Sequence, residues 1–343
     1  MKHRVAIVGA GIAAFAAALR CARQGMAVTV LAPARKARPE FPEMLSVGGV
    51  GALLGLGLQR SDLARRFPEV RERQSRWGDS RMEIRARIPG VPNPVMLGKT
   101  SLVGVLREAA VDSGADVVEI DRLTAAMQNG SGLQVTFVHD NHVHEMACSY
   151  AIDASGRPAL LARQVGARRS TLDHLVAFFI RGPALPEFAC FVATMSIADG
   201  WVFWACDEAG QGTCAFFTAG RKLGEHVTAA SVMSRVPAEI QGMMTDTQAW
   251  AASEVEPFNC STSALDQSCA DRWLACGDAL QTFDPLASRG VATALQQGDA
   301  AAQAIAAAVG GDRSVLASYR EQAQSSFRRY VAERNAYYGS GHS

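Results

Sequence analysis

The first thirty residues alternate between short apolar runs and small residues. Residues 4–8 (RVAIV) are rich in β-branched side chains and predict a buried strand, and residues 28–31 (VTVL) predict a second one. Between them lies the alanine-rich stretch AAFAAALRCARQG, which predicts a helix capped by Gly25. This order of elements predicts a parallel strand–helix–strand unit at the start of the chain.

Apolar runs with a period of two dominate the middle of the chain. Residues 121–138 predict a β-meander, and residues 150–157 (YAIDASGR) predict a short buried strand that ends in a turn. The runs HLVAFFIRG, FACFVATM, WVFWAC and TCAFFTAG predict an antiparallel sheet. The helical period returns at residues 314–338, which predict a packing helix.

The N-terminal turn carries the sequence GAGIAA, a GxGxxA pattern between a strand and a helix. Gly9 permits the tight turn, Gly11 lets backbone N–H groups approach a pyrophosphate, and Ala14 lets the helix pack close to the sheet. The pattern predicts dinucleotide binding. The alternative is a tight turn in a buried unit without a ligand.

The second strand does not end on the acidic residue that usually holds the ribose hydroxyls of a dinucleotide. The chain has APARK at residues 32–36, so Arg35 is a candidate cofactor contact. Arginine and lysine favour a 2′-phosphate, and this unit alone therefore does not separate FAD from NADP.

The later segments DASG at 153–156, WLACGDAL at 273–280 and FDPLASRG at 283–290 distinguish the two dinucleotides. Together they resemble the flavoprotein monooxygenases of the glutathione-reductase-like FAD fold. The resemblance implies that an acid bonds the ribityl chain and that a helix start faces the N1–C2=O edge of the flavin. The cofactor contacts that it implies are Asp153, Gly156, Gly277, Asp278, Pro285 and Gly290. The alternative is that Asp278 caps a helix and Pro285 ends a loop.

Further motifs are RWG at 76–78, SLVGVLREAAVDSGADV at 101–117, GWVFWACDEAGQGTCAFFTAG at 200–220 and SYREQAQSSFRRYVAERNAYYG at 318–339. With matching segments from residue 4 to about residue 338, the chain is similar to the tryptophan-halogenase-like flavoproteins. The branch that is most similar hydroxylates peptidyl tryptophan during the biogenesis of quinone cofactors. True halogenases carry a WxWxIP segment and a lysine that handles hypohalous acid, whereas this chain has WVFWA at 201–205 and PEML at 42–45. Lys99 is therefore expected to be a solvated or flavin-side cation.

The expected fold class is α/β, with a glutathione-reductase-like Rossmann FAD domain, an inserted antiparallel β-sheet substrate layer and a C-terminal helix. The expected boundaries are 1–40, 95–160 and 265–315 for the FAD domain, 41–94 and 161–264 for the substrate side, and 316–343 for the helix.

Aromatic side chains are the candidates for the substrate pocket, because an oxygenating flavin needs a dry site. Trp77, Trp201 and Trp204 are the best candidates, although an aromatic in a strand is more often part of a core. Glu43 and Arg76 are equally compatible with a site and with the surface. His139, His142 and His144 could bind a metal, but the spacing favours a solvated hairpin end, and no metal site is predicted.

Composition limits the partners. The 343 residues carry a net charge of +1, so no basic field for nucleic acid or anionic lipid is expected, and the substrate is expected to be a small molecule or a peptide. The eight scattered cysteines predict core thiols in a reducing cytoplasm. MKHR and the apolar run after it are similar to a secretory signal, but the glycine pattern opposes this interpretation. Residues 44–58 are too short and too rich in glycine for a membrane span.

The function that follows is an FAD-dependent monooxygenase. It is expected to use O₂ and to hydroxylate an electron-rich aromatic, such as an indole within a peptide, through a flavin C4a-hydroperoxide. Electrons would come from NAD(P)H or from a separate flavin reductase. The alternatives are a halogenase, a prenyl-type reductase on the same fold, and a non-enzymatic protein that binds FAD or a partner.

Overall fold

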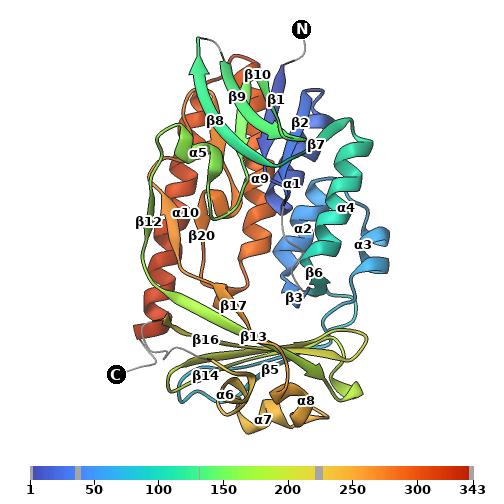
Figure 1. Cartoon of the computed structure of the whole chain (residues 1–343). Coiled ribbons are helices and arrows are strands. Elements are labelled where there is room, and N and C mark those ends of the chain that lie inside the picture. The colour runs from blue at the N-terminus through green and yellow to red at the C-terminus, as the bar shows by residue number, and fades with distance from the viewer. Residues whose placement is uncertain (1–2, 35–39, 131, 221–226, 340–343) are drawn as a thin grey trace.

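The computed structural model describes residues 3–34, 40–130, 132–220 and 227–339. Figure 1 shows a parallel sheet with its helices in the upper part of the molecule and a wide, mainly antiparallel sheet across the bottom. Helix α10 runs along one side from the first part to the second. The expected α/β fold class is confirmed.

The parallel sheet has five strands in the order β19-β11-β1-β2-β7. Its strands are Trp273–Ala275 (β19), Tyr150–Asp153 (β11), Arg4–Val8 (β1), Ala27–Pro33 (β2) and Ala115–Ile120 (β7). Both neighbours of β1 are parallel to it, with Val5 opposite Tyr150 on one side and Val28 on the other. Its last four residues are fully buried, which explains why this strand has no polar positions after Arg4.

Helices Ile12–Arg23 (α1) and Lys99–Asp112 (α4) pack on this sheet, and Gly290–Val309 (α9) packs on α1. Small residues bring α1 and α9 together, because a Cβ atom on Gly298 would lie 2.5 Å from the Ala13 carbonyl oxygen. Ala14 is fully buried. The alanine-rich sequence of both helices therefore reflects their close packing on each other.

The segment after β2 also joins this core. It comprises Pro42–Leu45 (β3), Val47–Gly55 (α2), Arg60–Arg66 (α3) and Val95–Gly98 (β6). The side chains of Leu45, Leu53 and Leu63 pack into the same apolar cluster as β1 and α1. The expected boundaries assign residues 41–94 to the substrate side, whereas the apolar face of α2 is buried against the parallel-sheet core.

The predicted meander is confirmed as Arg122–Asn129 (β8), Gly132–His139 (β9) and His142–Cys148 (β10). Asp140 and Asn141 form the turn between the last two strands with positive φ values of 50° and 62°. Helix Leu160–Gln164 (α5) follows β11.

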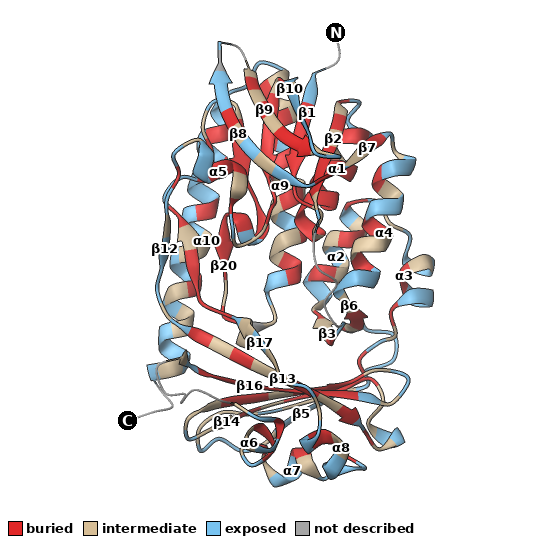
Figure 2. Cartoon of the chain, in the orientation of Figure 1, coloured by how far each residue is buried: buried red, intermediate tan, exposed pale blue. Residues whose placement is uncertain are grey.

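The lower sheet has seven strands in the order β17-β13-β16-β15-β14-β4-β5. These are Glu256–Asn259 (β17), Leu175–Pro183 (β13), Gln211–Ala219 (β16), Gly200–Cys206 (β15), Phe191–Ile197 (β14), Glu72–Arg76 (β4) and Glu83–Ala86 (β5). The antiparallel pairing predicted for the four long apolar runs is confirmed. Figure 2 shows buried residues along β13 and exposed residues on the short helices that lie below the sheet.

Short helices cover the outer face of this sheet: Ala229–Met233 (α6), Ala238–Gln241 (α7) and Thr247–Ala251 (α8). A third, small sheet joins Arg169–Thr171 (β12), Ser263–Leu265 (β18) and Gln281–Thr282 (β20). The remaining elements are the 3₁₀ turns Pro186–Phe188 (η1), Gly277–Ala279 (η3) and Pro285–Ala287 (η4), and helix Ser314–Gly339 (α10). No helix in the described part of the chain is long and apolar enough to cross a membrane.

Candidate cofactor and substrate site

The turn between β1 and α1 leaves an open helix N-terminus. Gly9 has a φ of 134°, and a Cβ atom there would lie 2.2 Å from the Ala154 carbonyl oxygen, so only glycine fits. Gly11 precedes α1 without any side-chain cap, and a Cβ atom on it would meet no atom within 4 Å. Free backbone N–H groups therefore face open space, which is the arrangement that binds a pyrophosphate.

Asp153 has a different position from the one that the resemblance implies. Its side chain is fully buried and accepts hydrogen bonds from the Ser155 N–H at 3.0 Å, the Ser155 hydroxyl at 2.7 Å and the Ala162 N–H at 2.7 Å. Burial raises the pKa of Asp153, and these hydrogen bonds oppose the shift. Both carboxylate oxygens are used inside the protein, so Asp153 holds the turn and the start of α5. Gly156, with a φ of 81°, continues the same turn.

Asp278 lies where β19 leaves the parallel sheet. Gly277 has a φ of 60°, and a Cβ atom there would lie 2.7 Å from Ala13, which brings the η3 turn against α1. The Asp278 side chain is exposed, while its carbonyl oxygen accepts a hydrogen bond from Arg169 at 3.0 Å. A fixed backbone with an exposed carboxylate suits a hydrogen bond to a polyol. The sequence analysis missed Arg169, which supports this turn from β12.

A second open helix N-terminus follows η4. Asp284 is buried and accepts a hydrogen bond from the Leu286 N–H at 2.9 Å, with Pro285 at the first position of the turn. Helix α9 then begins at Gly290 with no side-chain cap, and a Cβ atom on Gly290 would meet no atom within 4 Å. Helix α9 therefore presents the positive end of its dipole to an open space.

Lys99 and Glu43 form an ion pair at the first residue of α4. Their Nζ and Oε1 atoms are 2.6 Å apart, because β3 and β6 pair and bring the two residues together. The charge of Glu43 is the main cause that raises the pKa of Lys99, and the charge of Asp278 adds to it. Lys99 is thus a cation beside the turn that carries Asp278. The sequence singled out both residues but did not pair them.

The face of the seven-stranded sheet that is turned toward the parallel-sheet part is aromatic, and we call it the inner face. Its ring contacts are close: Trp201 stacks on Phe217 with centroids 3.7 Å apart, and Phe179 lies 4.9 Å from Phe258. Leu286, one residue after Pro285, packs against the same cluster. The inner face therefore lies next to the turn that precedes α9. The side chains that form it are Leu175, Ala177, Trp201, Ala215, Phe217 and Cys260, with Trp77, Phe179, Phe203, Phe258 and Leu286 packed on them.

Of the three tryptophan candidates, the structure brings two to the inner face. Trp77 and Trp201 belong to its cluster, whereas Trp204 is fully buried on the opposite face, in a cluster that includes Trp250 of α8. Trp201 and Trp204 are three residues apart on one strand, and side chains alternate with a period of two. Trp204 therefore does not line a pocket with the other two.

The C-terminal end of α10 reaches the inner face, which the sequence analysis did not predict. The Trp201 Nε1–H donates to the Tyr338 hydroxyl at 3.1 Å, and that hydroxyl donates to Asp284 Oδ2 at 2.6 Å. The Trp77 Nε1–H donates to the Tyr337 carbonyl oxygen at 3.1 Å. Burial raises the pKa of Asp284, and the hydrogen bond from Tyr338 opposes this shift. The end of α10 thus connects the aromatic side chains with the η4 turn.

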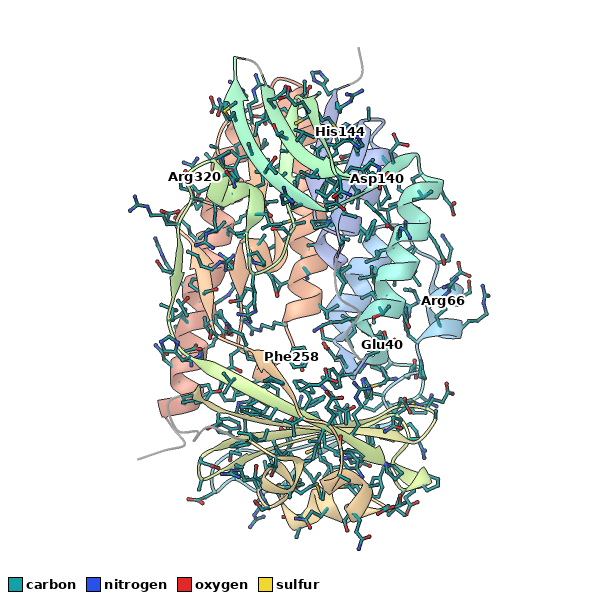
Figure 3. The ribbon with its side chains drawn as sticks, in the orientation of Figure 1. Glu40, Arg66, Asp140, His144, Phe258 and Arg320 are labelled. Atoms are coloured by element: carbon teal, nitrogen blue, oxygen red, sulfur yellow. The ribbon has the colours of Figure 1, made fainter. Side chains whose placement is uncertain are left out.

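A cavity of about 550 Å³ lies at the β17 edge of the same sheet. It is an open hollow at the strand edge and not an enclosed pocket. Figure 3 places Phe258, one of its lining residues, between the two parts of the molecule. Val176 and Phe178 alternate with the inner-face residues Leu175 and Ala177 on β13, so the cavity opens at the outer face of the sheet edge and shares only Phe258 with the inner-face cluster. Its lining residues are His174, Val176, Phe178, Gly220, Pro257, Phe258, Asn259 and Ser261.

The remaining candidates lie elsewhere. Arg35 falls outside the described residues. His139 and His144 lie 5.8 Å apart on the β9–β10 hairpin, and Figure 3 shows His144 at the end of the molecule away from the lower sheet. Among the described residues, no group of three or more His, Cys, Asp or Glu side chains is placed to hold a metal ion. All eight cysteines are free and buried.

Two uncapped helix N-termini, an exposed carboxylate between them and a lysine beside that carboxylate fit an extended cofactor with a central pyrophosphate. Gly9, Gly11 and Gly277 leave the space that such a group needs. FAD therefore fits the residues present: Gly11 would face the pyrophosphate, Asp278 the ribityl chain and Gly290 the flavin.

Comparison with known proteins agrees with this fit. Residues 2–334 match the FAD binding domain family. LodB of Marinomonas mediterranea, a putative FAD-dependent oxidoreductase, is 26% identical over 250 residues, which are 71% of this chain and 66% of LodB. The solved halogenase CmlS has a TM-score of 0.81 at 20% identity and covers 100% of this chain, which spans 66% of CmlS. The peptidyl tryptophan dihydroxylase QhpG has a TM-score of 0.77 at 22% identity, covering 99% of this chain and 76% of QhpG. Because the family match extends over nearly all residues, this chain belongs to the FAD binding domain family.

Proposed function

We propose that this protein is a monooxygenase that hydroxylates an electron-rich aromatic substrate with O₂. The observation that carries the proposal is the position of the inner face beside the η4 turn and the start of α9. The aromatic side chains there provide a dry surface beside the N-terminus of α9, where the flavin is expected. When bound and reduced, FAD supplies the activation of O₂.

The side chains of this chain bind, orient and exclude water. The N–H groups after Gly11 hold the pyrophosphate, and the N-terminus of α9 stabilises negative charge at its open end. Trp201 and Phe217 are buried and stack on each other beneath the inner face, where the partly buried rings of Phe179, Phe203 and Phe258 would contact an aromatic substrate. The reaction consumes two electrons from the reductant, transfers one oxygen atom to the substrate and releases the other as water.

We further propose that the aromatic substrate is an indole within a peptide. Two points support it. One protein of similar fold, QhpG, is a peptidyl tryptophan dihydroxylase. The inner face also carries the partly buried aromatic side chains Phe179, Phe203 and Phe258, on which an indole could pack. The electron source is proposed to be NAD(P)H, bound directly or used by a separate flavin reductase.

The test begins with the absorption spectrum of the purified protein after reconstitution with FAD. O₂ consumption is then measured with NADH, with NADPH or with an added flavin reductase, in the presence of simple indoles and of tryptophan-containing peptides. The proposal expects a product heavier by one or more oxygen atoms and unchanged by bromide. A brominated product would assign the site to halogenation, and bound flavin without O₂ consumption in any arm would remove the monooxygenase assignment.

A further inference from the structure

The edge of the seven-stranded sheet formed by β4 and β5 carries a group of arginines, which we call the arginine edge: Arg71, Arg73, Arg85 and Arg87. We propose that the arginine edge is a docking site for an acidic, extended segment of a partner polypeptide, which adds to β5 as a further strand. This proposal goes beyond the proposed function and does not rest on it.

The register of the two strands places like charges opposite each other. Arg73 pairs directly with Arg85 across the antiparallel ladder. The ladder continues beyond β4 and β5, because the Arg87 N–H donates to the Arg71 carbonyl oxygen at 2.7 Å. Like charges directly opposite on neighbouring strands are destabilising. An anionic ligand would relieve this repulsion.

Carboxylates compensate only part of the charge on this face of the strands, because Glu72 alternates with Arg73 on β4 and bonds Gln74 on the other face. Glu83 pairs with Arg85, with Oε1 2.9 Å from Nε, and Glu69 pairs with Arg87 at 3.1 Å. Arg71 and Arg73 form no ion pair with another described residue. Burial lowers the pKa of Arg73, and the charge of Arg85 lowers it further, with Glu83 acting in the opposite direction. The arginines of the edge thus outnumber the carboxylates that pair with them.

The outer side of β5 is open. It is the last strand in the sheet order, and all four of its residues are exposed. In an antiparallel pair the hydrogen-bonded positions alternate, so the N–H and C=O groups of Ile84 and Ala86 point away from β4. Charged side chains protect many natural edge strands. Here, however, Ile84 and Ile88 are also exposed, by 57% and 59%, which leaves apolar surface for a partner.

The positive charge of the arginine edge and the alternation of side chains along β5 indicate which kind of segment binds there. A second copy of β5 paired about Arg85 or Ala86 would place arginines beside arginines, so self-association in these registers is disfavoured. The net charge of +1 gives no general attraction for a polyanion. A segment with carboxylates at alternate positions fits better, because its acidic side chains face Arg85 and Arg87 while the intervening apolar ones meet Ile84.

The docking site lies on the same side of the sheet as the inner face. Arg73 is opposite Val192 in the β4–β14 register, and Val192 packs in a cluster against Phe203 of the inner face. A partner bound along β5 would therefore be held at the open end of the aromatic surface.

The test uses the full-length FAD-loaded protein and fluorescence anisotropy of a labelled peptide in which three glutamates alternate with valines. Arg85→Glu combined with Arg87→Glu is expected to weaken binding at least tenfold. Ala86→Pro removes one outward N–H without removing charge and is expected to weaken it as well. The matched control is Arg65→Glu with Arg66→Glu on α3, two exposed arginines that change the net charge equally and are expected to leave binding unchanged.

A peptide of the same composition with its glutamates in one block, and one with lysines in place of glutamates, are expected to bind more weakly. If the peptide with contiguous glutamates bound equally well, or if the α3 control variant lost binding equally, general charge attraction would explain the result and the proposal would be overturned. Tighter binding of single-stranded oligonucleotide that depends on Arg85 and Arg87 would assign the edge to nucleic acid instead. Absence of peptide binding, with normal flavin content and circular dichroism, would also overturn it.

Discussion

The two faces of the seven-stranded sheet use the same kinds of residues for different purposes. On the outer face, Trp204 lies among Phe191, Phe188 and helices α6 to α8, and its Nε1 has no hydrogen-bond partner among the described residues. On the inner face, Trp201 is equally buried but donates to Tyr338, which donates to Asp284.

This difference shows that burial alone does not distinguish a structural aromatic from a functional one. The outer cluster is closed by apolar side chains, and its stability depends on packing. The inner cluster is bordered by polar groups that reach the η4 turn, so a change there alters the position of groups beside the cofactor. The four predictions below test this distinction, beginning with the largest effect.

Replacing Trp204 by alanine is expected to have the largest effect on stability. Truncation of a fully buried tryptophan leaves a large cavity and lowers the free energy of unfolding by about 3–5 kcal/mol. Urea unfolding followed by circular dichroism measures the change. Trp204→Phe is the control and is expected to cost less, since it keeps most of the volume and removes the unpartnered N–H. Folded Trp204→Ala is expected to keep its FAD affinity, and a loss of affinity in the folded state would connect the outer face with the cofactor.

Replacing Trp201 by alanine is expected to affect coupling more than stability. The variant loses the stacking on Phe217 and the hydrogen bond to Tyr338, and it admits water to the inner face. A destabilisation of about 3 kcal/mol is expected from the cavity. The decisive measurement is the ratio of product formed to O₂ consumed, which is expected to fall several-fold more in Trp201→Ala than in Trp201→Phe. An unchanged ratio would remove Trp201 from the substrate site.

Replacing Tyr338 by phenylalanine tests the link between the inner face and η4. The change removes only the hydroxyl that bonds Asp284 at 2.6 Å, and a lost hydrogen bond to a buried charged group costs about 1–3 kcal/mol. The free energy of unfolding and the coupling ratio are both expected to fall. Tyr337→Phe is the matched control, because the Tyr337 side chain is 59% exposed and its carbonyl oxygen keeps the bond to Trp77. Equal effects in both variants would contradict a specific role of Tyr338.

The smallest expected effect is a pH dependence that arises from Asp284. Burial raises its folded-state pKa above the usual value of 3.8, so the folded protein binds this proton more tightly than the unfolded chain. Between 3.8 and the higher folded pKa, the contribution of Asp284 to the free energy of unfolding therefore decreases as the pH rises.

Asp284→Asn removes this titration. The difference in free energy of unfolding between wild type and variant is expected to slope downward with increasing pH in that window and to be flat well above it. Chemical denaturation at several pH values measures the slope. A slope of the opposite sign would show that the hydrogen bonds to the carboxylate outweigh its burial.

Local patterns determined much of this protein. Gly9, Gly11 and the apolar run before them predict the β1–α1 turn, because a positive φ and a close backbone approach leave few alternatives to glycine. The period-two runs predict the antiparallel strands for a similar reason, since the alternation of side chains is a property of each strand by itself. The turn alone left FAD and NADP open, and the flavoprotein resemblance carried by the GDAL and DPLASRG segments implied FAD.

Tertiary structure decided which of these residues meet. The sequence did not show that Asp153 turns inward, since its partners, Ser155 and Ala162, depend on the packing of α5. Trp201 and Tyr338 are 137 positions apart, and no periodic pattern records their contact. The pairing of Lys99 with Glu43 depends on the register of β3 and β6. Short-range periodicity comes from backbone geometry, whereas these contacts are selected by the packing of distant segments, and only the folded chain brings them together.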